Sequence, residues 1–347
     1  MSMSILFVGA VNRNAPPANG EEYKNQMILG FLDPQFHVKV IDTKNWSREP
    51  GTLIRLMIHM LFIPYDRIIL SASSASVFRL LDTFRFFKRR LSKTTYFVIG
   101  GYFPKALSDG KYKVRAYQSL FSIVVEGESM RKQLLSLGIE APVHVVPNFK
   151  KVNKCYGQSD RFMSGVTKFI FVSRIAEQKG VDTIFEALSD SRLNGLHGQF
   201  EVDFYGPIEK EYREIFNRKL TVNKFCQYKG YLDFSNHPEA SYENMATYHA
   251  MLFPTYWIGE GFPGAIIDAF ICGIPVIGTD WNMNREVIED GKTGRLVSVN
   301  DPKALADAML DVMNNRLVWQ DMSRHCQQRA SEFDTNLVLQ KHLNHII

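Results

Sequence analysis

Two carboxylates in a glycine-rich stretch are the side chains that the sequence places best for chemistry. They are Glu260 and Asp268, within GEGFPGAIIDAFICGIPVIGTD at residues 259–280. The glycines at its start let the backbone come close to a ligand, because a side chain there would be in the way. Gly273 and Pro275 are typical of a helix end. The stretch is therefore predicted to run as a loop, a helix, a tight turn and a buried strand.

The predicted helix begins at Pro263, a position where the missing N–H of proline costs nothing. A helix start carries unpaired N–H groups and partial positive charge, which together bind anions. Glu260 precedes that start and Asp268 lies within the helix. The two could flank a phosphate and accept hydrogen bonds from the vicinal hydroxyls of a ribose or a hexose. Isolated acids would be better explained as a helix-start charge and a buried paired acid, but the Gly–Pro–Gly setting favours the binding interpretation.

Two cations follow another buried strand. In FIFVSRIAEQKG the strand is predicted to end at Ser173, and Arg174 and Lys179 come before a helix that begins after Gly180. Arginine can bind phosphate in a bidentate way, and lysine adds a point charge. Either residue alone would be explained as a surface cation. Together they suit a diphosphate whose charge must be neutralised as it leaves.

The elements that would position these residues alternate between strand and helix. Apolar runs predict buried parallel strands, and helical periodicity separates them. The expected strands are residues 5–11, 37–42, 67–71, 95–99, 122–125, 143–146, 168–173, 199–205, 227–231 and 250–254. This alternation indicates doubly wound α/β domains, in which ligands bind at the carboxyl ends of the strands. The polar segment 150–166 is the expected linker.

A glycine-bearing loop follows the first expected strand. It contains Pro16, Pro17 and Gly20, and a helix is expected at residues 21–32. Such an arrangement suits a phosphate or substrate lip, but an ordinary connection fits at least as well, and the dinucleotide fingerprint GxGxxG is absent. Further helices are expected at residues 53–63, 76–90, 210–216 and 239–249.

Composition narrows the class of protein. The chain has 347 residues, enough for about two domains, and its 45% hydrophobic and 22% charged residues are ordinary for a globular protein. A net charge of +5 is too mild to indicate nucleic acid. The four cysteines are scattered along the chain without a paired spacing, so we expect them to be reduced. The nine histidines show no metal-binding spacing. The N-terminus enters a strand without a signal peptide, and no apolar run spans a bilayer, so a cytosolic protein is expected.

An aromatic and basic cluster runs from Phe84 to Lys93, FRFFKRRLSK. A basic amphipathic helix can lie on an anionic membrane surface. A helix with an aromatic stripe toward the core and a solvated basic face explains the same pattern equally well. The mild positive charge of the chain fits the membrane interpretation, and charge reversal at Arg89 and Arg90 would test it on anionic vesicles.

Five segments follow one another in the order and spacing of a known family: FIFVSRIAEQKGVDTIFEAL, DFYGP, YKGYL, GEGFPGAIIDAFICGIPVIGTD and GKTGRLV. They resemble glycosyltransferase family 4, retaining nucleotide-sugar-dependent enzymes of the GT-B fold, and above all its bacterial surface-polysaccharide branch. The resemblance is strong over residues 166–312 and weaker in the first half, where VVEGESMRKQLLSLGI and VVPNF carry it.

The resemblance implies two Rossmann-like α/β domains, each with a doubly wound parallel sheet, that face each other across a cleft. The acceptor-side domain would comprise residues 1–152, with a C-terminal helix at about 331–347 packing back onto it. The donor-binding domain would comprise residues 153–330. The protein would be cytoplasmic, and the cluster from Phe84 to Lys93 would make it peripheral on the inner face of the cell membrane.

Roles follow from the resemblance for residues at matching positions. Arg174 and Lys179 would contact the donor diphosphate. Glu260 would lie beside the donor sugar, as the first acid of the family's Glu–seven residues–Glu motif, and Asp268 stands where the second acid binds ribose. The other matching residues are Gly20, Gly261, Phe262, Pro263, Gly264 and Ala265 for the diphosphate and sugar, and Gly206, Tyr231 and Leu232 for the base.

The sequence departs from the family in two places. Aspartate at 268 keeps the carboxylate but shortens its reach by one methylene, so the loop must come closer or the ribose contact weakens. Many relatives have a histidine near the reacting sugar, after the fourth strand of the first domain. This chain has IGGYFPK there, so Tyr102 or a backbone carbonyl would take that place, or nothing would. Gly101 and Tyr102 are the residues expected in the acceptor-side cleft.

The implied reaction moves a hexose-type sugar from a nucleoside-diphosphate sugar to a glycan or a lipid-linked oligosaccharide. UDP is the first expectation for the donor and GDP the second. No nucleophile is evident, so the resemblance implies a front-face displacement in which the leaving phosphate receives the acceptor proton. The absence of Asp-x-Asp argues against a phosphate-bridging metal. No cofactor and no nucleic-acid partner are expected.

Three other functions stay open on the same fold. An epimerase would need acid–base groups and no acceptor. A phosphorylase would usually need a pyridoxal lysine, for which no motif is evident. A non-catalytic nucleotide-sugar-binding subunit is favoured by the missing histidine and opposed by the intact set of Arg174, Lys179 and Glu260. Donor hydrolysis or transfer would distinguish them.

Overall fold

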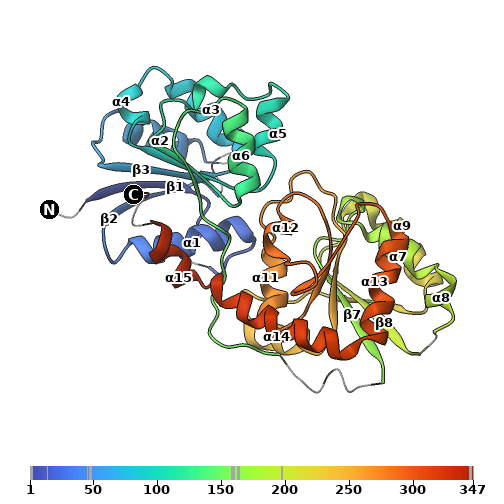
Figure 1. The fold of residues 1–347 in the computed structure, drawn as a ribbon. Coiled ribbons are helices and arrows are strands. Elements are labelled where there is room, and N and C mark those ends of the chain that lie inside the picture. Colours follow the sequence, from blue (N-terminus) through green and yellow to red (C-terminus); the bar gives the residue numbers. More distant parts are fainter. Residues whose placement is uncertain are drawn as a thin grey trace. The chain divides into compact units, whose positions relative to one another are not determined.

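The computed structural model divides the chain into two compact units (Figure 1). The first comprises Met1–Phe149 and Thr335–Ile347, and the second comprises Lys150–Asp334. The structure describes residues 3–13, 15–44, 46, 49–157, 161, 165–196, 198–343 and 346. The sequence had placed the boundary between residues 152 and 153 and the returning helix at about 331–347. The expected cleft between two facing domains stays a prediction.

The first unit is built on a parallel sheet of six strands, in the order β2-β1-β3-β4-β5-β6. These strands are β1 (Ser4–Gly9), β2 (His37–Asp42), β3 (Arg67–Ala72), β4 (Thr94–Val98), β5 (Ser122–Val125) and β6 (Val143–Val145). The helices are α1 (Gly20–Leu32), α2 (Pro50–Leu61), α3 (Ser74–Phe84), α4 (Lys88–Leu91), α5 (Phe103–Ser108), α6 (Glu128–Ser136) and α15 (Thr335–His342), with a 3₁₀ turn, η1 (Val114–Ala116). Continuous apolar runs form the central strands because helices cover both faces of such a sheet.

The last helix joins the first unit. Val338 and Leu339 of α15 are buried in one hydrophobic cluster with Ile28 and Leu29 of α1 and Phe7 of β1. The two termini of the chain therefore share a core, and burial of this apolar surface holds α15 there.

The second unit repeats the architecture, with the strand order β12-β11-β10-β7-β8-β9, all parallel. The strands are β7 (Thr167–Val172), β8 (Phe200–Tyr205), β9 (Cys226–Gly230), β10 (Ala250–Phe253), β11 (Val276–Thr279) and β12 (Gly294–Val297). The helical elements are η3 (Glu177–Lys179), α7 (Val181–Leu188), α8 (Ser191–Asn194), η4 (Lys210–Tyr212), α9 (Arg213–Val222), α10 (Pro238–Met245), α11 (Gly264–Ile271), α12 (Asn284–Val287), α13 (Pro302–Asn314) and α14 (Arg316–Glu332).

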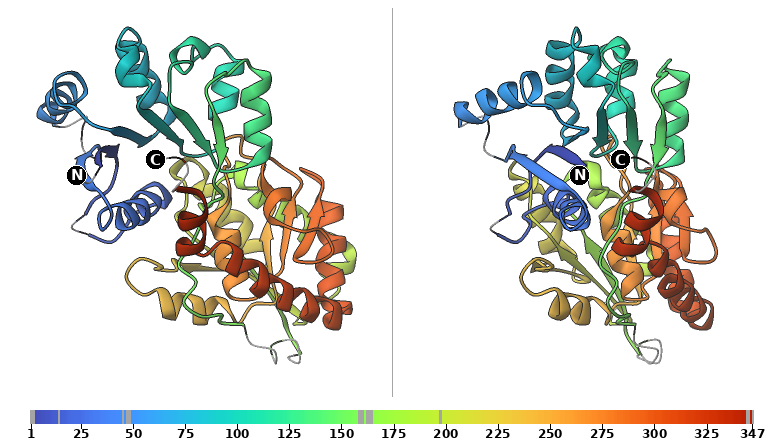
Figure 2. Two further views of the ribbon diagram at one scale, coloured as in Figure 1. Left: turned by 60° about the vertical axis from the view of Figure 1, so that its left-hand side comes forward. Right: turned by 90° about the vertical axis from the view of Figure 1, so that its left-hand side faces the viewer.

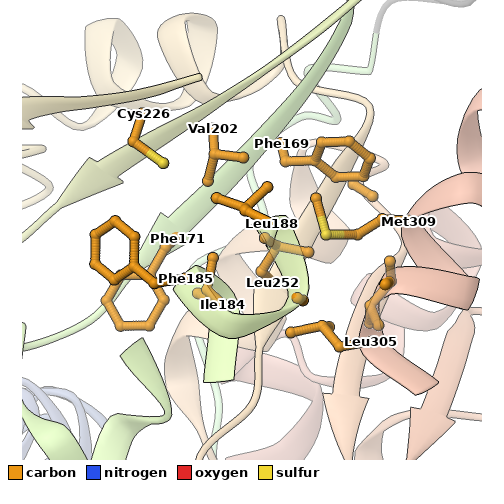
Figure 3. Packing of buried hydrophobic residues seen from close by; sticks show 14 of the residues in the cluster. Phe169, Phe171, Ile184, Phe185, Leu188, Val202, Cys226, Leu252, Leu305 and Met309 are labelled. Carbon is orange, nitrogen blue, oxygen red and sulfur yellow. The ribbon is translucent and has the colours of Figure 1, made fainter. Parts of the chain in front are cut away.

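The core of the second unit lies between its sheet and the helices α7 and α13 (Figure 3). Phe169 and Phe171 of β7 pack with Phe185 of α7 and with Leu305 and Met309 of α13 in one buried cluster. This packing fixes β7 at the middle of the sheet. The loop that leaves its carboxyl end is therefore carried by a rigid element.

The structure corrects the helix that the sequence placed at residues 76–90. Helix α3 ends at Phe84 and α4 begins at Lys88. Phe84 is buried, and the N–H of Phe87 donates to the carbonyl of Phe84 (2.8 Å) in a turn. Core burial of Phe84 and the carbonyl contacts of Arg90 described below favour this break over a continuous helix.

Other helix bounds also differ from expectation. Residues 210–216 divide into η4 and the start of α9, which continues to Val222. Helix α10 ends at Met245, earlier than the expected 249. In the described part of the chain, no helix combines the length and the apolar character needed to cross a bilayer.

Candidate active site

The candidate residues of the second unit gather where the sheet changes its direction of growth. Strands β7 and β10 are neighbours, and the sheet extends outward from them through β8 and β9 on one side and β11 and β12 on the other. Arg174 and Lys179 follow β7, and Glu260 follows β10. A crevice at the carboxyl ends of the strands, at such a switch point, is where doubly wound sheets bind ligands.

Lys179 and Glu260 form a buried ion pair. The Nζ of Lys179 lies 2.6 Å from Oε2 of Glu260, and the Thr255 hydroxyl donates to the same oxygen (2.9 Å). Among the described residues, no donor contacts the other carboxylate oxygen, Oε1. One oxygen of Glu260 is thus fixed by the protein, and the second can accept a hydrogen bond from a ligand.

The ring of Trp257 lies beside both cations. The Nζ of Lys179 is 4.4 Å from the ring centroid, and the Cζ of Arg174 is 5.2 Å from it. Arg174 also approaches Glu209, with 3.6 Å between Nη1 and Oε1, and both side chains are largely exposed. The quadrupole of the indole attracts cations on its face. Arg174 is therefore held near the site by weak contacts that a phosphate could replace.

The loop that carries Glu260 is fastened to its surroundings by hydrogen bonds. The Asn282 side-chain amide donates to the carbonyl of Glu260 (3.2 Å), and the Trp281 indole N–H donates to the carbonyl of Trp257 (2.9 Å). The N–H of Tyr256 donates to the carbonyl of Gln178 (3.0 Å), next to Lys179. The loops after β7 and β10 are therefore joined directly.

A glycine makes the close approach of these loops possible. Gly180 has φ +75°, and a Cβ added there would lie 2.0 Å from the carbonyl oxygen of Pro254. Only glycine accepts both this left-handed conformation and this contact. The position of Lys179, one residue earlier, depends on it.

Asp268 is buried inside α11 with both oxygens occupied. Oδ2 accepts from the Lys150 ammonium (2.9 Å), and Oδ1 accepts from the Tyr242 hydroxyl (2.8 Å). Tyr156 stacks on Tyr242 with 5.1 Å between the ring centroids. A ribose hydroxyl that binds Asp268 must therefore add to these hydrogen bonds or exchange with one of them.

The residues expected to hold sugar and phosphate surround the start of α11. Pro263 is the residue before the helix, and Gly264 and Ala265 are its first two residues, so the helix begins one residue later than expected. Phe262 is buried and packs edge-on against Phe333, with 5.3 Å between ring centroids. Gly261 leads into this turn. The first N–H groups of a helix lack intrahelical partners, so this end of α11 suits an anion.

The expected base-side residues lie at the ends of β8 and β9. The N–H of Gly206 donates to the carbonyl of Gly230 (2.8 Å), and the Tyr228 hydroxyl donates to the carbonyl of Gly206 (3.1 Å). Tyr231 follows directly and is exposed, and Leu232 is half-buried. The structure thus brings Gly206 beside Tyr231.

The candidates in the first unit lie at the carboxyl ends of its strands. Gly20 is the first residue of α1, where the Asn19 side chain accepts from the N–H of Glu22 (2.9 Å). Gly101 follows β4, and Tyr102 precedes α5, its hydroxyl accepting a hydrogen bond from the Lys111 ammonium. Their predicted contacts with donor and acceptor stay predictions, as does the substitution of Tyr102 for a histidine.

No group of three or more His, Cys, Asp or Glu side chains able to hold a metal ion occurs among the described residues. The expectation of metal-independent chemistry stays a prediction. The charged side chains at the switch point are the cations Arg174 and Lys179 and the carboxylate of Glu260, which is paired with Lys179. This set of charges suits an anionic ligand.

Sequence reasoning missed five residues that shape this site: Thr255, Trp257, Asn282, Lys150 and Tyr242. Four of the five act through contacts with residues distant in the chain, so no local pattern pointed to them; Thr255 lies five residues before its partner Glu260. The only signal was that Trp257 and Trp281, two of the four tryptophans, flank the glycine-rich stretch.

Comparison with known proteins identifies the family of the second unit. Residues 161–333 match the family model Glycosyl transferases group 1, and through this domain the chain belongs to that family. Among the curated relatives to which the chain is similar are two N-acetylglucosaminyltransferases. One is the 2-deoxystreptamine N-acetyl-D-glucosaminyltransferase of Niallia circulans, 25% identical over 52% of this chain and 45% of the relative. The other is the poly(ribitol-phosphate) alpha-N-acetylglucosaminyltransferase of Staphylococcus aureus, 22% identical over 67% and 45%.

The chain thus spans less than half the length of these curated relatives. A solved structure resembles it along its whole length. It is that of Alr3699/HepE from Anabaena in complex with UDP and glucose, with a TM-score of 0.74, 15% identity and coverage of 99% of each chain. This likeness shows the GT-B fold, with two doubly wound parallel sheets.

Proposed function

We propose that this protein transfers a hexose-type sugar from a nucleoside-diphosphate sugar to a glycan or lipid-linked oligosaccharide in bacterial surface-polysaccharide synthesis, with retention at the anomeric carbon. UDP is the first choice of donor nucleotide and GDP the second. The observation that carries the proposal is the ion pair of Lys179 and Glu260 at the switch point. Arg174 lies beside the Trp257 ring, which Lys179 also contacts. Family membership and the UDP and glucose bound to Alr3699/HepE support it.

The geometry suggests a separate role for each of the charged residues. Arg174 and Lys179 neutralise the diphosphate as its bond to the sugar breaks, and the first N–H groups of α11 add positive potential. Lys179 has two N–H donors left after its bond to Glu260. Glu260 uses Oε2 to hold Lys179 and Oε1 to orient a sugar hydroxyl.

The proposed step needs neither a separate base nor a metal. The bond between the anomeric carbon and the phosphate oxygen breaks through an oxocarbenium-like state. The acceptor oxygen bonds to the same face of that carbon, and its proton passes to the leaving phosphate. The lone pair of the broken bond stays on the diphosphate, where the two cations stabilise it.

A thermal-shift panel of UDP, GDP, ADP and CMP on wild type, Arg174→Ala and Arg324→Ala tests the donor site. Arg324 is an exposed arginine of α14 and serves as the matched control. We expect UDP to stabilise wild type and the control but not Arg174→Ala. The proposal fails if no nucleotide stabilises wild type, or if Arg174→Ala responds as wild type does.

Product analysis distinguishes the proposed transferase from the other functions on this fold. Incubation with UDP-hexoses and a lipid-linked acceptor should release UDP and give a glycoside with the donor's anomeric configuration by NMR. An altered hexose still linked to UDP would identify an epimerase. Binding of UDP without turnover of any donor would identify a nucleotide-sugar-binding subunit.

A further inference from the structure

Helix α2 exposes apolar side chains along its outer face. Ile54 is 61% exposed and Phe62, just after the helix, is 76% exposed, and Leu53, Met57 and Ile58 are exposed with them. Thr52, Leu56 and Met60 are buried on the opposite side. A helix that is apolar all round is normally covered on every side. Here the inner face meets the first unit and the outer face meets solvent.

The turn between α3 and α4 also exposes apolar side chains, and α4 is hydrogen-bonded to the end of α2. The Arg90 guanidinium donates to the carbonyls of Leu61 (3.0 Å) and Ile63 (2.9 Å), which fastens α4 to the end of α2. Phe86, 77% exposed, and Phe87 project from that turn. Both views of Figure 2 show α2, in medium blue, at the outer margin of its unit.

We call this surface the α2 patch; its apolar members are Leu53, Ile54, Met57, Ile58, Phe62, Phe86 and Phe87. Basic side chains border it. Lys88 and Arg89 are exposed on α4 and, within the part of the chain that the structure describes, neither has an acidic partner at ion-pair distance. Arg55 is exposed on α2 itself.

The acids near the patch are few. Asp82 pairs with Arg85 (3.2 Å), whose guanidinium lies 4.6 Å from the Phe86 ring centroid, and Glu49 precedes the start of α2. The balance of charge around the apolar face is therefore positive. Exposed apolar patches rimmed by polar residues mark interaction sites.

We propose that the α2 patch docks on an anionic lipid bilayer. Its apolar side chains would enter the acyl boundary, and Lys88, Arg89 and Arg55 would lie among the anionic headgroups, the arrangement typical of interfacial amphipathic helices. Charge complementarity selects the occupant, because a bilayer offers an apolar interior and a negative surface together. The inference does not rest on the proposed transfer reaction.

The structure also changes how the surface should be tested. Arg90 holds two backbone carbonyls of the α2 segment, so reversing its charge would disturb the fold. Lys88 and Arg89 are the basic residues whose change tests docking alone. The expected amphipathic helix from Phe84 to Lys93 is replaced by two elements, with the larger apolar face on α2.

Vesicle flotation with the full chain tests the proposal. The vesicles are phosphatidylcholine alone and phosphatidylcholine with about a third phosphatidylglycerol. The variants are Ile54→Ser/Phe62→Ser and Lys88→Glu/Arg89→Glu. The matched controls are Leu317→Ser/Val318→Ser, exposed apolar residues of α14, and Arg218→Glu/Lys303→Glu, exposed basic residues of α9 and α13. Circular dichroism melting checks that each variant folds.

We expect wild type to bind the anionic vesicles and to dissociate at high salt. Each basic side chain near such a surface contributes about fivefold in partitioning, so the double reversal should weaken binding at least about twentyfold. The serine pair should weaken it at least about tenfold, and the controls should bind as wild type. The proposal is overturned if wild type binds no vesicle or if both patch variants bind as wild type. It is equally overturned if the serine pair converts a dimer to a monomer by sedimentation velocity, since the occupant is then a second copy.

Discussion

The ammonium of Lys179 lies 2.6 Å from a carboxylate oxygen of Glu260, 81 residues further along the chain. Lys179 ends the 3₁₀ turn η3 after β7, and Glu260 precedes α11 after β10. Both side chains are buried, so each charge depends on the other for compensation. Folding of the loops after β7 and β10 therefore brings together the two charges that the proposed reaction uses.

Removing one member of this pair should destabilise the protein more than removing both. Lys179→Met leaves the Glu260 carboxylate buried with only the Thr255 hydroxyl, and we expect a loss of about 3 kcal/mol. Lys179→Met/Glu260→Met should recover part of that loss, because no buried charge remains. Urea unfolding of wild type, Lys179→Met, Glu260→Met and the double variant forms a double-mutant cycle, which measures the coupling energy of the pair. Equal stability of Lys179→Met and wild type would contradict the buried pair.

Glu260→Gln should separate catalysis from nucleotide binding. The amide keeps the shape of the side chain but holds the sugar hydroxyl less strongly, while Lys179 stays available to the diphosphate. We expect kcat to fall at least about a hundredfold, as for a lost charged positioning group. The Kd for UDP by calorimetry should stay within about threefold of wild type. Unchanged turnover would remove Glu260 from the sugar site.

The role of Asp268 can be tested on the ligand as well as on the protein. If Asp268 contacts ribose, wild type should bind UDP at least about tenfold more tightly than 2′,3′-dideoxy-UDP, since a hydrogen bond to a charged group contributes about 1.5–3 kcal/mol. Asp268→Asn should lose most of that preference. An equal preference in both proteins would leave Asp268 as the partner of Lys150 and Tyr242 alone.

Gly206→Ala should destabilise the second unit strongly. Gly206 has φ +132°, and an added Cβ would lie 1.9 Å from the carbonyl oxygen of Ser173. Gly230 is the matched control, with φ +82° and nothing within 4 Å of an added Cβ. Backbone strain alone costs about 1 kcal/mol, so Gly230→Ala should lose about that amount and Gly206→Ala clearly more by urea unfolding. Equal losses would mean that the contact with Ser173 relaxes freely.

His249 should make stability depend on pH. Burial lowers the pKa of His249 to about 4; its Nδ1 accepts from the N–H of Lys168 (3.0 Å), and its Nε2 contacts the carbonyl of Arg161 (2.7 Å). The His249 imidazole therefore takes up its proton near pH 6.5 in the unfolded chain and near pH 4 in the folded one. The free energy of unfolding should therefore fall by up to about 1.4 kcal/mol per pH unit between these values, and level off below them.

Urea unfolding at pH 7, 6 and 5 measures this contribution. Wild type should lose more stability on acidification than His249→Gln does. His237→Gln is the control, because His237 is exposed in the same unit. A wild type and a His249→Gln variant with the same pH dependence would contradict the assignment.

Local patterns in the sequence were enough to predict much of this protein. Continuous apolar runs such as 5–8 predicted buried parallel strands, and their alternation with helical segments predicted two doubly wound sheets, which the structure confirms. The glycine-rich stretch at 259–280 predicted its loop, helix, turn and strand in order. These features follow from interactions between residues that are close in the chain, namely backbone conformation, helix ends and the periodicity of burial.

The tertiary structure decided which partners each polar group has. The sequence predicts Asp268 as a ligand-facing acid, and that stays a prediction; it gave no sign that Lys150, 118 residues away, and Tyr242 bind its oxygens. Phe84 to Lys93 reads as one helix, yet Arg90 binds carbonyls near the end of α2 and the chain breaks. Whether a charged group is paired, and whether an apolar face is covered, depends on burial by segments distant in sequence. Periodicity along the chain carries no record of those contacts.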